Sequence, residues 1–345
     1  MTVPALAAVV PKPEADRAIA ALRSEGVYDD GRSVVEAGDG TVELPVTAAP
    51  TETAVLDVVE QVEPVPRQRG LEDRLRERGW TDAELERAPG SWSVVGDAVL
   101  VRFPADCPDR EAVAEALLEL QGADTVLAEG DVSGPTREPD VEVVAGSGDT
   151  EVVHVEHGTR YALDLAEVMF SPGNQAERVR MGEVVEPGER VLDAFAGIGY
   201  FALPMARAGA EVTAVEVNPA AFGYLVENAA LNGVTDRLSA TLGDCRAVVG
   251  PDGPGAAAPG AADRLVLGHF EAADALEALL PALRPGGTVH LHAAAPETGE
   301  GADEPVEALD AAASSLGRSA SVEDRREVKS YAPGVAHVVV DATVD

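Results

Sequence analysis

Apolar and polar positions alternate as strands and helices through the second half of the chain. Short apolar runs typical of buried strands end at residues 192, 217, 242, 267 and 292. Longer segments with helical periodicity separate most of these runs. Strands that alternate with helices in this way predict an α/β fold with a doubly wound, mainly parallel sheet.

The first two of these strands frame a glycine turn. Leu192 ends the first strand, Asp193 stands at its tip, and Gly197 and Gly199 form the turn. The second strand ends on Glu216, 23 residues beyond Asp193. Strand, glycine turn, helix and acid-tipped strand form the nucleotide-binding half of such a sheet, where the second acid accepts from ribose hydroxyls.

Three interpretations of the turn compete. A dinucleotide site requires G-x-G-x-x-G, because the third glycine lets the helix approach a pyrophosphate. Here Ala202 stands at the third position, and Asp193 would repel a pyrophosphate. An acid at the first strand tip favours a cationic ligand without phosphate, such as S-adenosylmethionine (AdoMet). A turn that only packs a helix on the sheet is the third possibility.

Acidic residues also follow the third strand. Because parallel sheets bind ligands beyond the carboxyl ends of their strands, Asp193, Glu216 and Asp244 are expected to share one crevice. Unpaired carboxylates gathered there repel one another, although each alone suits a helix cap or a solvated tip. AdoMet would satisfy all three. Glu216 would accept from the ribose, Asp244 and the Cys245 backbone would hold adenine, and Asp193 would lie near the methionine end.

The net charge is strongly negative. With 26 basic and 61 acidic residues, the formal charge is −35, and only Lys12 and Lys329 are lysines. Such a charge normally argues against nucleic-acid binding. Acids spread over every segment instead indicate adaptation to high salt, where screening shortens repulsion to about 3 Å at 1 M. The charge therefore indicates a halophilic protein and is compatible with a tRNA partner.

The remaining composition predicts a soluble, cytoplasmic protein with no membrane span and no metal. Cys107 and Cys245 are isolated and have no metal-ligand spacing. No apolar run reaches the roughly 18 residues of a membrane helix, and the N-terminus does not resemble a signal peptide.

Four segments are expected along the chain. Residues 1–47 form a small N-terminal segment, and 48–70, rich in Pro, Thr and Glu, form a linker or insertion. Residues 71–150 form an α+β domain, and 151–345 form the catalytic domain. Within the latter, the Gly/Ala/Pro-rich stretch 251–262 is expected to be a loop.

Five motifs carry a family resemblance: Phe170-Ser-Pro-Gly-Asn-Gln-Ala-Glu-Arg178-Val-Arg180-Met, the turn 193–201, Glu216-Val-Asn-Pro, Gly243-Asp-Cys-Arg and Lys329-Ser-Tyr-Ala-Pro. Together they resemble the archaeal and eukaryotic enzymes that modify the guanosine 3′ of the tRNA anticodon. The resemblance implies a Rossmann-like class I AdoMet-dependent transferase domain behind a smaller α+β tRNA-binding region.

The resemblance also implies roles for individual residues. Ser171 and Arg178 would contact AdoMet, with the Arg178 guanidinium forked onto the methionine carboxylate. An exposed helix arginine paired to a neighbouring acid is the structural alternative for Arg178. Asn174, Arg180 and Lys329 are the tRNA candidates, with the modified base leaving the anticodon stack to reach the crevice. No general base is assigned.

Two branches of this superfamily differ at positions that the sequence shows. The tRNA guanine-37 N1-methyltransferases have Ser-Pro-Arg in the 170–174 loop and Asn-Leu-Pro after the fourth strand. This chain has Gly173-Asn174 and Leu267-Gly268-His269. It thereby resembles the wybutosine-pathway aminocarboxypropyltransferases, which act on 4-demethylwyosine in tRNA-Phe.

Both branches use the same cofactor. AdoMet presenting its methyl group gives methylation, whereas its γ-carbon gives transfer of the 3-amino-3-carboxypropyl group and releases methylthioadenosine. Aminocarboxypropyl transfer is the first hypothesis and guanine-37 N1-methylation the second. A catalytically silent tRNA- or AdoMet-binding module is the third.

Overall fold

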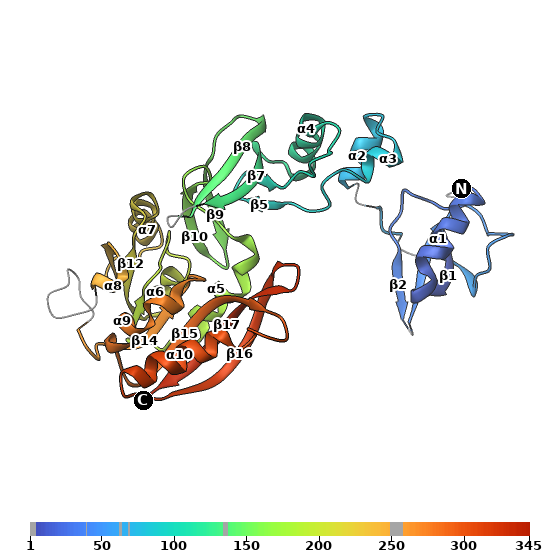
Figure 1. Ribbon diagram of the computed structural model, residues 1–345. Helices are drawn as coiled ribbons and strands as arrows, with labels where there is room; N and C mark the ends of the chain where they lie inside the picture. The colour runs from blue at the N-terminus through green and yellow to red at the C-terminus, as the bar shows by residue number, and fades with distance from the viewer. Residues whose placement is uncertain (1–4, 39, 62–63, 68–69, 134–136, 249–257) are drawn as a thin grey trace. The chain divides into compact units, whose positions relative to one another are not determined.

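The computed structural model describes residues 5–38, 40–61, 64–67, 70–133, 137–248 and 258–345 (Figure 1). The chain divides into two compact units, Met1–Trp80 and Thr81–Asp345. The part of the 251–262 stretch up to residue 257 lies outside the described residues.

The first unit is a four-stranded sheet in the order β2-β3-β1-β4 with a helix packed against it. Leu22 of the helix is fully buried with Ala8 and Leu44 of the two central strands. The elements are β1 (Leu6–Pro11), η1 (Lys12–Glu14), α1 (Ala15–Ser24), β2 (Val35–Gly38), β3 (Thr41–Val46), β4 (Asp57–Glu60) and α2 (Leu71–Glu77).

Strand β4 corrects the interpretation of residues 48–70 as a linker or insertion. Its residues 57–60 pair antiparallel with β1 and complete the edge of the sheet. This strand is only four residues long and has a charged residue at each end, so its sequence shows no clear strand pattern. The division between the units also falls after Trp80, so α2 belongs with the first unit.

The second unit begins with a four-stranded sheet in the order β5-β6-β7-β8. Helix α4 makes the crossover between the parallel strands β6 and β7, and the Asp109 side chain caps its N-terminus by accepting from Ala112 N at 3.0 Å. The elements are α3 (Asp82–Leu85), β5 (Ser93–Val95), β6 (Ala98–Val101), α4 (Arg110–Gln121), β7 (Thr125–Ser133) and β8 (Glu138–Gly146).

A two-stranded hairpin and a short helical segment connect this sheet to the larger one. The hairpin turns at His157-Gly158, and Gly96 N in the β5–β6 turn donates to His154 Nδ1 at 3.1 Å. This bond joins the four-stranded sheet to the hairpin. The elements are β9 (Glu151–Glu156), β10 (Thr159–Asp164), η2 (Pro172–Asn174) and α5 (Gln175–Glu183).

The larger sheet has seven strands in the order β13-β12-β11-β14-β15-β17-β16. The first five are parallel, and β17 and β16 extend the sheet antiparallel. After β11 the chain adds β12 and β13 on one side and then returns to add β14 and β15 on the other, so the topological switch point lies between β11 and β14. The strands are β11 (Arg190–Asp193), β12 (Glu211–Glu216), β13 (Leu238–Leu242), β14 (Ala262–Leu267), β15 (Leu283–Pro296), β16 (Ala320–Ala332) and β17 (Val335–Val344).

Helices cover both faces of this sheet and bury two hydrophobic cores. Met181 of α5, Met205 of α6 and Leu225 of α7 belong to one core, and Leu276 of α9 and Leu309 of α10 to the other. This arrangement confirms the Rossmann-like class I fold. The helices are α6 (Ala202–Ala208), α7 (Pro219–Leu231), α8 (Cys245–Val248), η3 (Ala272–Ala275), α9 (Leu276–Leu279), η4 (Leu280–Ala282) and α10 (Glu304–Ser315).

Candidate functional site

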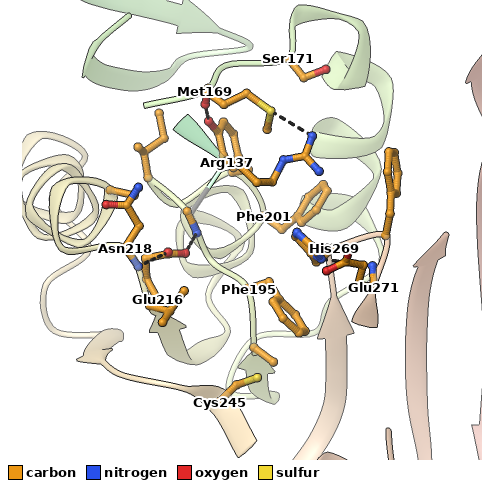
Figure 2. Close-up of a pocket in the computed structure, with 18 of the residues that line it drawn as sticks. Arg137, Met169, Ser171, Phe195, Phe201, Glu216, Asn218, Cys245, His269 and Glu271 are labelled. Carbon is orange, nitrogen blue, oxygen red and sulfur yellow. Dashed lines mark hydrogen bonds between the residues drawn. The ribbon is translucent and has the colours of Figure 1, made fainter. Parts of the chain in front are cut away.

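A cavity of about 370 Å³ lies at the switch point. Residues that directly follow β11, β12, β13 and β14 line it, together with the 170–174 loop and parts of β16 and β17. Its volume lies within the roughly 300–1,000 Å³ of small-molecule sites. Figure 2 shows Cys245 and Ser171 on opposite sides of this cavity.

The strand-tip set comprises the lining residues Gly197, Glu216, Asn218, Asp244 and Cys245. Glu216 ties the glycine turn to the second strand. Its Oε2 accepts from Gly197 N at 2.7 Å, and its Oε1 accepts from Asn218 N at 2.7 Å (Figure 2). Burial raises the pKa of Glu216, and the backbone amides counteract that rise. Each carboxylate oxygen keeps lone pairs for a ligand hydroxyl.

Glycine is required at both turn positions for want of space. Gly199 has φ +102°, and a Cβ there would lie 2.7 Å from Leu203 Cγ. Gly197 has φ +57°, and its Cβ would lie 2.6 Å from Tyr200 Cε2. The two glycines therefore leave room for the Tyr200 and Leu203 side chains, and Gly197 itself lines the cavity.

Asp244 and Cys245 line the cavity where the sequence places them, but Asp244 is already paired. Its side chain is 44% exposed and forms a two-pronged ion pair with Arg246, at 2.9 Å to Nε and 2.6 Å to Nη2. Hydrogen bonds from Arg246 lower the pKa of Asp244. Cys245 is buried, which raises the pKa of its thiol to about 11.

Asp193 corrects the expectation of three acids facing one crevice. Its side chain is fully buried, and it does not line the cavity. Burial, followed by the neighbouring charge of Glu216, raises its pKa to about 7. Its Oδ2 has no hydrogen-bond partner in the part of the chain that the structure describes. The carboxylate of Asp193 is therefore buried in the protein interior, beneath the turn that follows β11 at residues 194–196.

The loop set comprises the lining residues Arg137, Ser171, Asn174, Arg178 and Lys329. Lys329 on β16 donates from Nζ to Ser171 Oγ at 2.6 Å. Asn174 Oδ1 is buried and has no partner among the described residues. Arg137 donates to Met169 Sδ at 3.3 Å, and its Cζ lies 5.7 Å from the centre of the Phe270 ring (Figure 2).

Arg178 differs from its expected role as a carboxylate anchor for the ligand. It is 2% exposed and forms a bidentate ion pair with Glu156, at 2.6 Å from Nε and 2.7 Å from Nη2. Its Nη1 donates to Ser171 O at 2.9 Å. Although burial raises it, the bonds from His154 and Arg178 lower the pKa of Glu156 overall. Arg178 therefore holds the 170–174 loop against the β9–β10 hairpin.

Arg180 is also engaged within the protein and does not line the cavity. It pairs with Asp341 on β17 and lies 3.8 Å from Glu177. Arg326 bridges the same two acids, at 2.5 Å and 2.6 Å. This cluster joins α5 to the antiparallel strands. Its carboxylates neutralise Arg180, which removes the ground for assigning it to tRNA.

Aromatic rings complete the cavity beside the loop set. Phe270 meets Tyr331 and His337 edge-on, with ring centres 5.0 Å and 4.9 Å apart. Burial lowers the pKa of His337 to about 4, so the ring is neutral. Its Nε2 lies 3.0 Å from Nδ1 of the buried His292.

Sequence reasoning missed His337 and Arg137. His337 stands in β17, where residues 336–342 are all buried, and no motif marks it. Arg137 occupies a turn at φ +54°, where an arginine carries no turn signal.

No helix among the described residues is long and apolar enough to cross a bilayer. Within the same residues, no group of three or more His, Cys, Asp and Glu side chains has an arrangement that would hold a metal ion.

Two family models match the chain. The model for the TRM5/TYW2 methyltransferase domain matches residues 152–321, and that for the TYW2 N-terminal domain matches 54–150. A tRNA(Phe) (4-demethylwyosine(37)-C(7)) aminocarboxypropyltransferase of Pyrococcus horikoshii is 38% identical over 284 residues, which are 81% of this chain and 99% of that protein. This chain belongs to the TRM5/TYW2 family.

Solved structures of the family share the fold. P. horikoshii TYW2 in complex with MeSAdo aligns with TM-score 0.67 and 36% identity, over 78% of this chain and 96% of that one. Trm5b from Pyrococcus abyssi aligns with TM-score 0.72 and 28% identity, over 99% of both chains. The family therefore includes both transferase branches that the sequence resembles.

Proposed function

We propose that this protein transfers the 3-amino-3-carboxypropyl group of AdoMet to C7 of 4-demethylwyosine at position 37 of tRNA-Phe. A bond forms between C7 and the γ-carbon of the methionine arm, the bond from that carbon to sulfur breaks with its electron pair left on sulfur, methylthioadenosine leaves, and the C7 proton passes to solvent.

One observation carries the proposal. The P. horikoshii aminocarboxypropyltransferase is 38% identical, and the alignment covers 99% of it. The Trm5b methyltransferase of P. abyssi is 30% identical over 77% of its length. The match of residues 54–150 to the TYW2 N-terminal domain supports the same branch.

The cavity fits AdoMet as co-substrate. Glu216, already oriented by two backbone amides, would accept from the ribose hydroxyls. Asp244 and the Cys245 backbone would face the adenine. Gly197 lines the cavity, so the ligand would pass close to the backbone of the turn there. Ser171 lies across the cavity from Cys245, where the methionine arm would extend.

The anticodon loop of tRNA is the proposed partner, and the cytoplasm the proposed location. The flipped base would enter beside Phe270 and Tyr331, two aromatic residues that line the cavity. The charge of −35 supports a high-salt setting, where phosphate repulsion is screened. Assays are therefore designed for concentrated KCl.

The identity of the nucleoside product tests the proposal. The protein is incubated with AdoMet and with tRNA-Phe that already carries the tricyclic precursor, and nucleosides are separated by chromatography. Methylthioadenosine together with a heavier tRNA base is the expected result. Unmodified tRNA with neither product would indicate a silent binding module.

A second candidate is guanine-37 N1-methylation, favoured by the alignment of Trm5b over 99% of both chains. S-adenosylhomocysteine formed with tRNA that carries an unmodified guanosine at position 37 would identify it and contradict aminocarboxypropyl transfer.

A further inference from the structure

Four cations line the cavity, and they differ in how their charges are balanced. Arg178 is paired with Glu156 and Arg246 with Asp244. Lys329 and Arg137 form no ion pair with the residues that the structure describes. In a chain with 61 acids and 26 basic residues, two unpaired cations in one cavity are unexpected.

Lys329 is held in place by the loop it faces. Its Nζ donates one of three N–H groups to Ser171 Oγ at 2.6 Å. The same serine's carbonyl accepts from Arg178, so the buried Arg178–Glu156 pair fixes the acceptor of Lys329. Burial, followed by repulsion from Arg178, lowers the pKa of Lys329; the charge of Glu129 partly opposes this, and Arg137 adds to the repulsion. An anion beside Lys329 would relieve the repulsion.

Gly173 provides the space for this arrangement. A Cβ at this position would lie 3.0 Å from Lys329 Cδ and 3.3 Å from its Nζ. The backbone of Gly173 lies outside the left-handed region, so a side chain here would be limited by space alone. A larger residue would push the lysine side chain away from Ser171.

We propose that Lys329, held against Ser171, binds the α-carboxylate of the methionine arm of AdoMet. This inference rests on the proposed function and replaces Arg178 as the anchor. Anchoring the carboxylate turns the γ-carbon, rather than the methyl group, toward the base, since the reacting carbon must sit about 3–3.5 Å from the nucleophile. Lys329 thereby acts in binding and in the choice of transferred group.

The test compares two ligands that differ in the methionine arm. Titration calorimetry measures AdoMet and methylthioadenosine, which lacks the carboxylate, on the wild-type chain and on Lys329→Met. We expect AdoMet affinity to fall roughly 10- to 100-fold, as for a lost hydrogen bond to a charged group. Methylthioadenosine affinity is expected to stay within about twofold, which also shows that the variant is folded.

Two further variants guard the interpretation. Gly173→Ala keeps the charge but crowds Lys329, and we expect a smaller loss of AdoMet affinity with the same indifference to methylthioadenosine. Arg137→Gln removes the other unpaired cation. Equal, AdoMet-selective losses for Arg137→Gln and Lys329→Met would overturn the assignment to Lys329, because the general positive field would then explain the effect.

A phosphate of tRNA is the competing anion. The affinity of precursor tRNA for Lys329→Met is therefore measured without AdoMet, and we expect it to equal the wild-type value. Weaker tRNA binding with unchanged AdoMet binding would overturn the proposal. Binding of AdoMet to the wild-type protein tests the proposed function. The ratio of AdoMet affinity to methylthioadenosine affinity in Lys329→Met tests the role of Lys329 alone.

Discussion

The strand-tip set and the loop set satisfy their charges in opposite ways. Glu216 receives two backbone amides from the turns beside it. Each partner lies within 19 residues of it along the chain. Lys329 reaches Ser171 from 158 residues away, and Arg178 is neutralised by an acid on another element. Glu216 is therefore satisfied by backbone amides, whereas Lys329 and Arg178 are held by contacts with other elements.

This difference predicts different responses to mutation. Backbone amides around Glu216 remain when the side chain is removed, so damage should concentrate on ligand binding. Side chains of the loop set neutralise and position one another, so removing one leaves a buried charge behind. Substitutions in the loop set should therefore lower both the free energy of unfolding and the affinity for AdoMet.

Arg178→Ala is expected to have the largest effect. Loss of the guanidinium leaves Glu156 buried without its partner, which costs about 3–5 kcal/mol of unfolding free energy. Chemical denaturation measures this, with the exposed Arg160→Ala as a control within about 0.5 kcal/mol. Wild-type stability together with an AdoMet-selective loss of affinity would restore Arg178 as the carboxylate anchor.

Glu216→Ala is expected to follow, with its effect on ligand binding. Removing the carboxylate takes away the ribose acceptor and leaves the amides of Gly197 and Asn218 without it. AdoMet and methylthioadenosine affinity should both fall by at least about 100-fold, or roughly 2.7 kcal/mol. Glu211→Ala, exposed at the start of the same strand, is the matched control. Retained affinity for either ligand would refute the ribose assignment.

Asp193→Asn is expected to stabilise the protein in a pH-dependent way. Because the folded-state pKa is about 7, above the usual 3.8, wild-type stability decreases as pH rises toward 7 and then levels off. The asparagine amide at this position does not ionise, so the variant lacks this pH-dependent loss of stability. The stability advantage of the variant over wild type should grow by about 2 kcal/mol between pH 5.5 and pH 8, because each pH unit below the folded-state pKa changes wild-type stability by about 1.4 kcal/mol. A gain independent of pH would contradict a buried, ionising Asp193.

Asp244→Asn is expected to have the smallest effect. Its ion pair with Arg246 is solvent-exposed, so the cost in stability should stay below about 1 kcal/mol. AdoMet affinity should fall about tenfold, or 1.4 kcal/mol, through the lost adenine contact. Chemical denaturation measures the change in stability, and titration calorimetry with and without added salt measures the change in AdoMet affinity. A loss of AdoMet affinity as large as that for Glu216→Ala would show that the exposed Asp244 contributes as much to binding as the buried Glu216.

Sequence alone determined the α/β class and the placement of Glu216, Asp244 and the glycine turn. These features were accessible because strand and helix periodicity is local, and because parallel strands align their carboxyl ends wherever each tip residue falls. The motifs also led to the family, which the comparisons confirmed.

Only the tertiary structure decided which charges meet. The pairing of Arg178 with Glu156, of Arg180 with Asp341 and of Lys329 with Ser171 depends on how a hairpin and two antiparallel strands pack beside the parallel sheet. The burial of Asp193 and the pairing of β4 with β1 depend likewise on neighbours distant along the chain or on how the chain folds over them. The sequence shows where charged residues stand along the chain. Long-range packing decides whether another side chain neutralises such a charge or leaves it available to a ligand.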